Sequence, residues 1–151
     1  MHIWVDADAC PKPIKDILFR AATRTGIAVT LIANQMLAVP RSPHIRAVQV
    51  PKGFDVADNE IAQRVDAGDL VITSDIPLAA EVIAKGGKVL TPRGEPYDKG
   101  SIAAALTMRN FMDTLRSTGV ETGGPAAFSA SDQHAFARQL DRALGGRKPT
   151  P

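Results

Sequence analysis

Residues 2–33 read HIWVDADACPKPIKDILFRAATRTGIAVTLIA, and this stretch decides the fold. Its two ends, residues 2–5 and 28–33, are apolar and rich in β-branched side chains, which predicts a short buried strand at each end. Between them, apolar residues recur at helical spacing, a pair of prolines fits a first turn, and Gly26 fits a stop. A helix between two strands predicts a parallel pair, because parallel strands need a crossover connection.

The same alternation continues along the next part of the chain. Further strands are predicted at residues 47–50, 70–73 and 88–90. Helices are predicted between them, one opening at Asp58 and one over residues 76–84. The pattern indicates an α/β fold, a three-layer sandwich whose central, mostly parallel sheet has about five strands and is covered by helices on both faces.

The composition changes after the fifth predicted strand. A helix is predicted at residues 103–115, a stretch rich in glycine and small residues follows at 118–131, and a last amphipathic helix is predicted at 132–144. We expect a single domain over residues 1–145. The final residues, 146–151, have glycine and proline punctuation and no apolar anchor, which predicts a flexible and dispensable tail.

Bulk composition excludes several classes of protein. The chain has 151 residues, a net charge of +2 and one cysteine, so it has no internal disulfide framework and no paired-cysteine zinc site. It has neither a signal-peptide pattern nor a stretch approaching the roughly 20 apolar residues that span a bilayer. We therefore expect a cytoplasmic protein without a membrane partner. The small net charge neither indicates nor excludes a nucleic acid, and the oligomeric state stays open.

Acidic residues gather where two predicted strands end. Asp6 and Asp8 follow the first strand, and Asp75 follows the fourth. The carboxyl ends of parallel strands meet at one edge of a sheet, and an extended backbone would point Asp6 and Asp8 to the same side. Clustered carboxylates repel one another unless a cation neutralises them, and hard oxygen ligands favour Mg²⁺ or Mn²⁺. Asp58 and Glu60 could reach the same edge, although Asp58 could instead cap its helix.

Several polar residues around this edge are candidates for binding a substrate. Asn34 ends the second strand, and the hydroxyls of Thr73 and Ser74 lie beside Asp75 in the sequence. Arg93 and Arg109, in the late loop and helix, could contact a phosphate, as could Arg116. We expect Cys10 to be buried and inert, because neighbouring carboxylates raise the pKa of a thiol.

Four strings of the sequence resemble a known family: VDADACP, DNEIA, TSDIPLA and TGGPAAFSASD. They are similar to the YaiI/YqxD family of bacterial proteins, the domain of unknown function 188, which is grouped with PIN-like nuclease domains. The resemblance implies a PIN-like sandwich in which acids at the ends of the first and fourth strands, and one from a helix between them, bind Mg²⁺ or Mn²⁺. Asp6, Asp8 and Asp75 match the strand-end acids. The helical acid would be Asp58 or Glu60.

Three functions compete on these observations. The leading one is a metal-dependent phosphodiesterase, nuclease-like, acting on RNA in preference to DNA, with Asp6, Asp8 and Asp75 as the catalytic ligands of two ions about 4 Å apart. The second is a phosphatase of the haloacid dehalogenase type, with Asp6 as nucleophile and Asp8 as acid/base. Against it, Cys10 stands where threonine or valine is usual. The third is a non-catalytic module that binds metal or nucleic acid.

Overall fold

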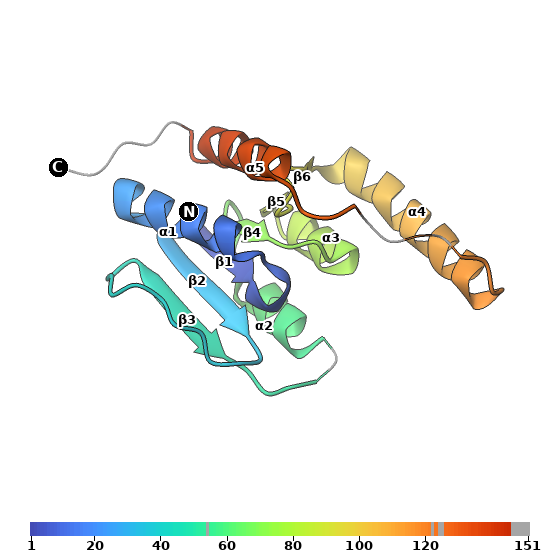
Figure 1. Ribbon diagram of the computed structural model, residues 1–151, viewed down its shortest axis with the longest axis horizontal. Coiled ribbons are helices and arrows are strands. Elements are labelled where there is room, and N and C mark those ends of the chain that lie inside the picture. The colour runs from blue at the N-terminus through green and yellow to red at the C-terminus, as the bar shows by residue number, and fades with distance from the viewer. Residues whose placement is uncertain (54, 122, 124–125, 146–151) are drawn as a thin grey trace.

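A computed structural model describes residues 1–53, 55–121, 123 and 126–145 of the chain. It has one six-stranded sheet in the order β3-β2-β1-β4-β5-β6 (Figure 1). The strands are β1 (His2–Asp6), β2 (Ala28–Ala33), β3 (Ile45–Gln49), β4 (Leu70–Ile72), β5 (Lys88–Leu90) and β6 (Pro96–Tyr97). All neighbours pair in parallel except β5 and β6, which are antiparallel. The α/β architecture with a mostly parallel sheet is therefore confirmed.

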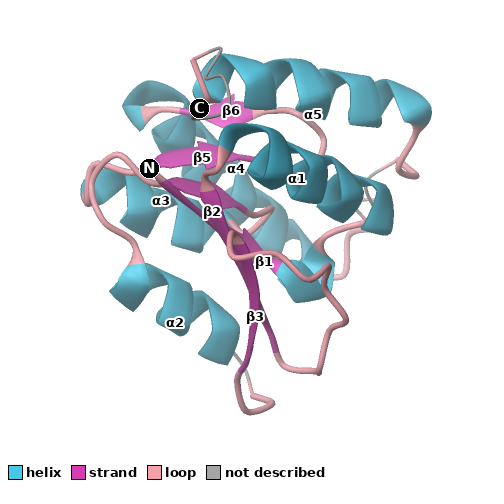
Figure 2. Ribbon diagram, turned by 90° about the vertical axis from the view of Figure 1, so that its left-hand side faces the viewer, coloured by secondary structure: helices cyan, strands magenta, loops and turns pink. Residues whose placement is uncertain are grey.

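In the described part of the chain, five helices cover the sheet in two layers (Figures 1 and 2). They are α1 (Lys12–Thr25), α2 (Val56–Arg64), α3 (Ile76–Ala84), α4 (Lys99–Ser117) and α5 (Ala130–Ala143), and a short 3₁₀ turn, η1 (Ala7–Ala9), joins β1 to α1. Side chains of α1 and α5 pack in one hydrophobic cluster, and those of α2 and α3 pack in a second. Strand alternation divides β1 between the two, since Ile3 and Val5 belong to the first cluster and Trp4 to the second.

Local sequence explains why α1 starts and stops where it does. Pro11 occupies the N-cap in extended backbone, and a second proline lies in the first turn, where its missing N–H is not needed. The helix buries Ile14 and Leu18 completely against the sheet. Gly26 ends it with a φ of 76°, a left-handed conformation that side chains other than glycine rarely adopt. The resulting turn delivers the chain into β2 beside β1.

The sheet order brings the first and fourth strands together at its centre. β1 lies between β2 and β4, so the direction in which strands are added reverses at β1. In open α/β sheets, ligands bind at the carboxyl edge beside such a reversal. The register pairs Val5 with Ile72, and this alignment places the residues that follow both strands next to each other.

α4 differs from the other helices in how little of it is packed. Ile102 is its only buried residue in the described chain, and its contacts are chiefly with α3. Its second half extends away from the sheet at the right of Figure 1, with Met108 and Phe111 exposed. No helix in the part of the chain described here is long and apolar enough to cross a membrane.

Some elements differ from the sequence prediction. β6 was not predicted, and α4 begins earlier, at Lys99, because Asp98 and Ser101 form a capping box. α5 begins earlier than predicted, at Ala130, because Ser129 and Asp132 form a second capping box. The N-cap of α2 is Asp55. The predicted tail, residues 146–151, lies outside the described residues.

Candidate metal centre

Thr73 ties the ends of the two central strands together. Its Oγ1 donates a hydrogen bond to Oδ2 of Asp6 at 3.1 Å and accepts one from the backbone N–H of Asp75 at 3.0 Å. Thr73 is buried, whereas Asp6 and Asp75 are half-buried. The hydroxyl thus fixes one carboxylate directly and positions the backbone that carries the other.

Three carboxylates converge in front of this edge. Asp55, Asp58 and Asp75 each offer an oxygen atom, and these atoms all lie within 4.8 Å of one another. Asp55 and Asp58 come from the start of α2, one helical turn apart. Asp75 is the N-cap of α3, where its Oδ1 accepts the backbone N–H of Leu78 at 2.8 Å. The starts of two helices, α2 and α3, therefore supply the three acids of the cluster.

Burial and the charges of neighbouring acids both disfavour the charged form of the carboxylates in this cluster. Burial raises the pKa of Asp58 to about 7, helped by the charges of Asp6 and Asp75 and by a side-chain hydrogen bond with Asp75. Burial also raises the pKa of Asp6, the Thr73 hydrogen bond opposes that rise, and the charges of Asp75 and Asp8 add to it. A bound cation would relieve this repulsion and restore both carboxylates to their charged form.

A pocket of about 300 Å³ opens in front of the three acids. Arg109 of α4 reaches its wall, and its Nη1 forms an ion pair at 3.3 Å with Asp113, one turn further along the helix. The other lining residues are Asn59, Pro77, Leu78 and Glu81, besides Asp55, Asp58 and Asp75. The poorly packed helix α4 thus supplies a cation to an otherwise acidic pocket.

The donor set fits a hard divalent cation. Oxygen ligands of Mg²⁺ lie at about 2.1 Å from the ion, so two of them are at most about 4.2 Å apart. At least two of the three pairs formed by three such ligands are neighbours at about 3 Å, so oxygens that already lie within 4.8 Å of one another need a modest side-chain movement to surround one ion. Carboxylate oxygens are the usual ligands of Mg²⁺ and Mn²⁺, and no cysteine or histidine is part of the cluster. The structure thus has an acidic cluster suited to a divalent metal, without identifying the metal.

Asp8 lies outside this cluster. The backbone after Asp6 turns into η1 and is not extended. The expectation that an extended backbone points the side chains of Asp6 and Asp8 to the same side is therefore wrong. The exposed carboxylate of Asp8 instead accepts the backbone N–H of Asn34 at 2.8 Å, which anchors the segment that follows β2. Asn34 reaches Asp8 through its backbone. The charge of Asp8 still acts on Asp6.

Asp58 and Glu60, the two alternatives for the helical acid, have different surroundings in the structure. Asp58 lies in the first turn of α2 and belongs to the cluster, and the N-cap position is taken by Asp55. Glu60 forms an ion pair with Arg64 at 3.0 Å on the outer face of the helix. The expectation that Asp58 caps α2 is therefore wrong.

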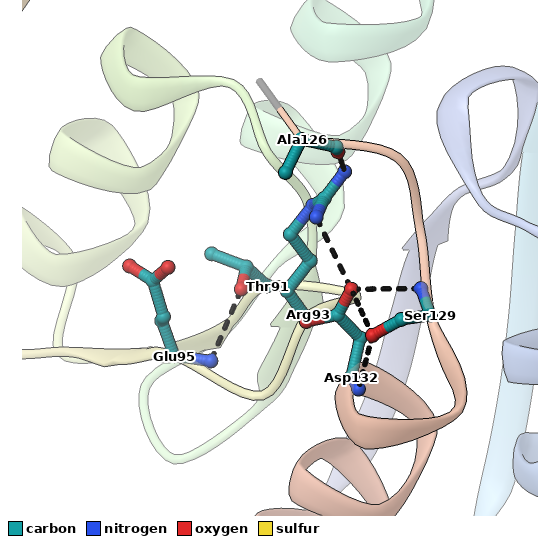
Figure 3. Close-up of polar contacts among 6 residues, drawn as sticks. All are labelled: Thr91, Arg93, Glu95, Ala126, Ser129 and Asp132. Atoms are coloured by element: carbon teal, nitrogen blue, oxygen red, sulfur yellow. Dashed lines mark hydrogen bonds and ion pairs between the residues drawn. The ribbon is translucent and has the colours of Figure 1, made fainter.

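The remaining sequence candidates have other surroundings. Ser74 is exposed beside Asp75. The guanidinium of Arg93 binds Asp132 at 3.1 Å and the carbonyl of Ala126, so it joins the turn after β5 to the start of α5 (Figure 3). Arg116 forms an ion pair with Asp113 at 2.7 Å. Cys10 is buried, and burial raises the pKa of its thiol to about 12, as expected of an inert cysteine.

Asp55 belongs to the acidic cluster but was not predicted as a site residue. This residue has a φ of 61°, a left-handed backbone that is uncommon for residues other than glycine and asparagine. Its spacing of three from Asp58, at the start of a helix, was the available signal, because residues three apart lie on the same face. No sequence pattern predicts the left-handed backbone that orients Asp55.

A sheet of this order with carboxylates converging at its carboxyl edge defines an α/β protein with an acidic cluster that could hold a divalent cation. The family model described as "Uncharacterized BCR, YaiI/YqxD family" (DUF188) matches residues 4–146. The chain belongs to this family. No solved structure shows a significant match.

Relatives of similar length cover almost the whole chain. A UPF0178 protein of Thioalkalivibrio sulfidiphilus is 67% identical over 147 residues, which cover 97% of this chain and 100% of the relative. A UPF0178 protein of Herminiimonas arsenicoxydans is 66% identical, with coverage of 95% and 97%. A third, from Aliivibrio salmonicida, is 58% identical, with coverage of 99% on both sides.

Proposed function

We propose that the protein is a metal-dependent phosphodiesterase of the nuclease-like kind, acting in the cytoplasm. The observation that carries the proposal is the convergence of Asp55, Asp58 and Asp75, with Asp6 beside them, at the carboxyl edge of the sheet. Asp6, Asp58 and Asp75 are half-buried and Asp55 is exposed, and four carboxylates so close together are costly without a cation. We prefer RNA to DNA as the substrate on the resemblance to PIN-like nucleases, and Mg²⁺ or Mn²⁺ as the metal on the chemistry of the ligands.

Each residue around the acidic cluster would have its own role in this reaction. A divalent metal in such a site lowers the pKa of a water and neutralises phosphate oxygens. Asp58 and Asp75 would hold the metal, with Asp55 and Asp6 completing its surroundings. Thr73 would keep Asp6 in place through its hydrogen bond of 3.1 Å. Arg109, on the pocket wall, would contact a phosphate oxygen of the substrate.

Asp8 is a poor acid/base for the competing phosphatase mechanism. That mechanism needs Asp8 to face the leaving group, but its carboxylate accepts the Asn34 N–H at 2.8 Å. The proposed nucleophile, Asp6, accepts a hydrogen bond from Thr73 on Oδ2, which reduces the nucleophilicity of that oxygen. The geometry therefore supports metal-assisted attack by water over a phosphoaspartate.

The experiment combines metal binding with turnover. Calorimetry with Mn²⁺ should show at least a tenfold loss of affinity in Asp58→Asn and Asp75→Asn. Asp141→Asn is the matched control, because Asp141 forms an exposed ion pair with Arg24, on the α1 and α5 side. Cleavage of a fluorogenic single-stranded RNA in Mn²⁺ should fall by two orders of magnitude or more in the same two variants and not in the control.

Two results would count against the proposal in different ways. Equal Mn²⁺ affinity in wild type, Asp58→Asn and Asp75→Asn would overturn the metal site. Tight, Asp58-dependent Mn²⁺ binding without hydrolysis of RNA, DNA or a simple phosphodiester would favour the non-catalytic module.

A further inference from the structure

A second hollow lies on the other face of the sheet. A cleft of about 440 Å³ is formed between α1 and the segment that follows β2, and it is larger than the acidic pocket. Its lining residues are Lys12, Lys15, Asp16, Phe19, Leu31, Leu37, Ala38 and Pro40. None of the acids of the metal cluster is among them.

The floor of this cleft is apolar. Leu31 of β2 is fully buried beneath it, and Phe19 and Leu37 are half-buried and pack against the same hydrophobic cluster. Ala38 and Pro40 form an exposed rim. A flat ring laid on such a floor would remove apolar surface from water on both partners, which is the main source of affinity in small-molecule sites.

The mouth of the cleft is cationic. Lys12 is exposed at the start of α1, and Lys15 is half-buried one turn later. Within the described residues, neither ammonium forms an ion pair, whereas Arg24, Arg64, Arg93 and Arg109 are all paired with acids. Asp16 is the one acid of the lining, so the cleft carries a net positive charge and suits an anionic ligand with an apolar part.

The cleft and the metal centre lie on either side of the end of β1. Burial raises the pKa of the Cys10 thiol, the charge of Lys15 opposes that rise and the charge of Asp6 adds to it, so both charged groups act on this residue. The Asp8 hydrogen bond to Asn34 anchors the start of the segment that forms the far wall of the cleft. One short stretch, from Asp6 to Cys10, therefore joins the acidic cluster to the cleft.

We propose that this cleft binds one nucleotide of a single-stranded nucleic acid, with the base on the floor made by Phe19 and Leu37, above the buried Leu31, and its phosphate held by Lys12 and Lys15. The choice of a nucleotide over another phosphorylated apolar ligand rests on the proposed function. The cleft would then hold a nucleotide near the one whose phosphodiester is cut. Substrate specificity would come from this face, and chemistry from the other.

The test uses nucleotide binding without metal. In EDTA, addition of 5′-AMP to the ¹⁵N-labelled full chain should shift the backbone amide signals of residues 12–19 and 37–40 and leave those of residues 55–59 unmoved. Adenosine and inorganic phosphate, added separately, should each bind at least tenfold more weakly than 5′-AMP. Phosphate that binds as tightly as the nucleotide, or shifts confined to residues 55–59, would overturn the proposal.

Variants separate this site from general attraction of anions. Lys12→Gln combined with Lys15→Gln should weaken 5′-AMP binding at least tenfold. Lys88→Gln combined with Lys99→Gln removes the same charge elsewhere and should leave binding unchanged. Ala38→Glu places a carboxylate on the exposed rim, where it cannot disturb the core, and should also abolish binding. Equal losses in both lysine pairs would show that the cleft is not the site.

The outcomes for the cleft and for the metal centre are distinguishable. Hydrolysis of RNA that depends on Asp58 but not on Lys12 and Lys15, with no binding of 5′-AMP, would overturn the cleft and keep the proposed function. Binding of 5′-AMP that needs both lysines, in a protein that binds no Mn²⁺, would overturn the proposed function and keep the cleft as a nucleotide site.

Discussion

Near the two ends of β4, the surroundings shift the pKa of a carboxyl group in opposite directions. At the amino end, Asp69 is buried, which by itself raises its pKa, yet the net pKa is lowered because N–H groups of Asp66, Trp4 and His2 donate to its carboxylate. At the carboxyl end, Asp58 lies among acids and has a pKa of about 7. A buried carboxylate whose oxygens are satisfied by N–H donors serves the fold. One surrounded by other carboxylates is costly to charge unless a cation neutralises it.

The largest expected effect tests the structural side of this comparison. Asp69→Ala leaves three N–H groups without their acceptor, including the indole Nε1–H of Trp4 at 3.1 Å. Leaving buried donors unsatisfied should cost about 3 kcal/mol of unfolding free energy. Chemical denaturation measures this cost, and Asp69→Asn, which keeps one acceptor oxygen, should lose less. A loss below 1 kcal/mol in Asp69→Ala would remove the contrast between the two ends.

The next effect concerns metal at the other end. Mn²⁺ at about one hundred times its Kd should stabilise the wild type by about 2.7 kcal/mol, because it binds only the folded state. Asp58→Asn and Asp75→Asn should lose this increment, whereas Asp69→Asn should keep it. Denaturation curves with Mn²⁺ and with EDTA give the unfolding free energy with and without metal, and their difference is the increment. An increment that survives in Asp75→Asn would mean that the metal binds elsewhere.

Removing a repelling charge should make the apo protein more stable. At pH 8 in EDTA, Asp58→Asn should gain roughly 1 kcal/mol over the wild type, a modest value because the half-exposed carboxyl is screened by solvent. The variant leaves the α2 cap, Asp55, in place. A loss of apo stability in Asp58→Asn would show instead that Asp58 has a structural role.

The same repulsion fixes the sign of the pH dependence. The folded-state pKa of Asp58, about 7, lies above the ordinary value of 3.8 for an aspartate, so its protonated form is favoured by folding. Its contribution to stability is therefore present at low pH and is lost as the pH rises from about 4 to about 7. The Asp69 contribution runs the other way and is lost as the pH falls below about 4. Denaturation in EDTA from pH 4.5 to pH 8 should show a downward slope in the wild type that Asp58→Asn reduces.

The smallest expected effect separates the two acids of α2. Glu60→Gln breaks an ion pair with Arg64 that spans four residues of the helix and should cost about 0.4 kcal/mol. Its Mn²⁺ affinity should equal that of the wild type, because Glu60 lies outside the acidic cluster. A tenfold loss of Mn²⁺ affinity in Glu60→Gln would contradict the assignment of Asp58 as the helical ligand.

Hydrophobic pattern predicted the sheet well and the site only in part. β2, β5 and α3 have the predicted bounds, because apolar runs and glycine or proline stops carry strong local signals. β6 has two residues, too few for a periodic pattern, and its place depends on pairing with β5. The positions of the acidic side chains depend on single turns. The η1 turn places Asp8 beside Asn34, and the left-handed backbone of Asp55 accompanies its place in the cluster. Such turns are set by tertiary contacts that spacing alone does not reveal.

The two outermost strands of the sheet also bear on how copies of this chain behave at high concentration. Unpaired backbone groups along an edge strand invite another strand to add, which is a common route to aggregation. β6 ends one side after two residues, and Pro96 has no N–H to offer. β3 forms the other side and carries the exposed Arg46 and Gln49. A charged edge on one side and a proline-blocked edge on the other should keep the sheet from growing between molecules.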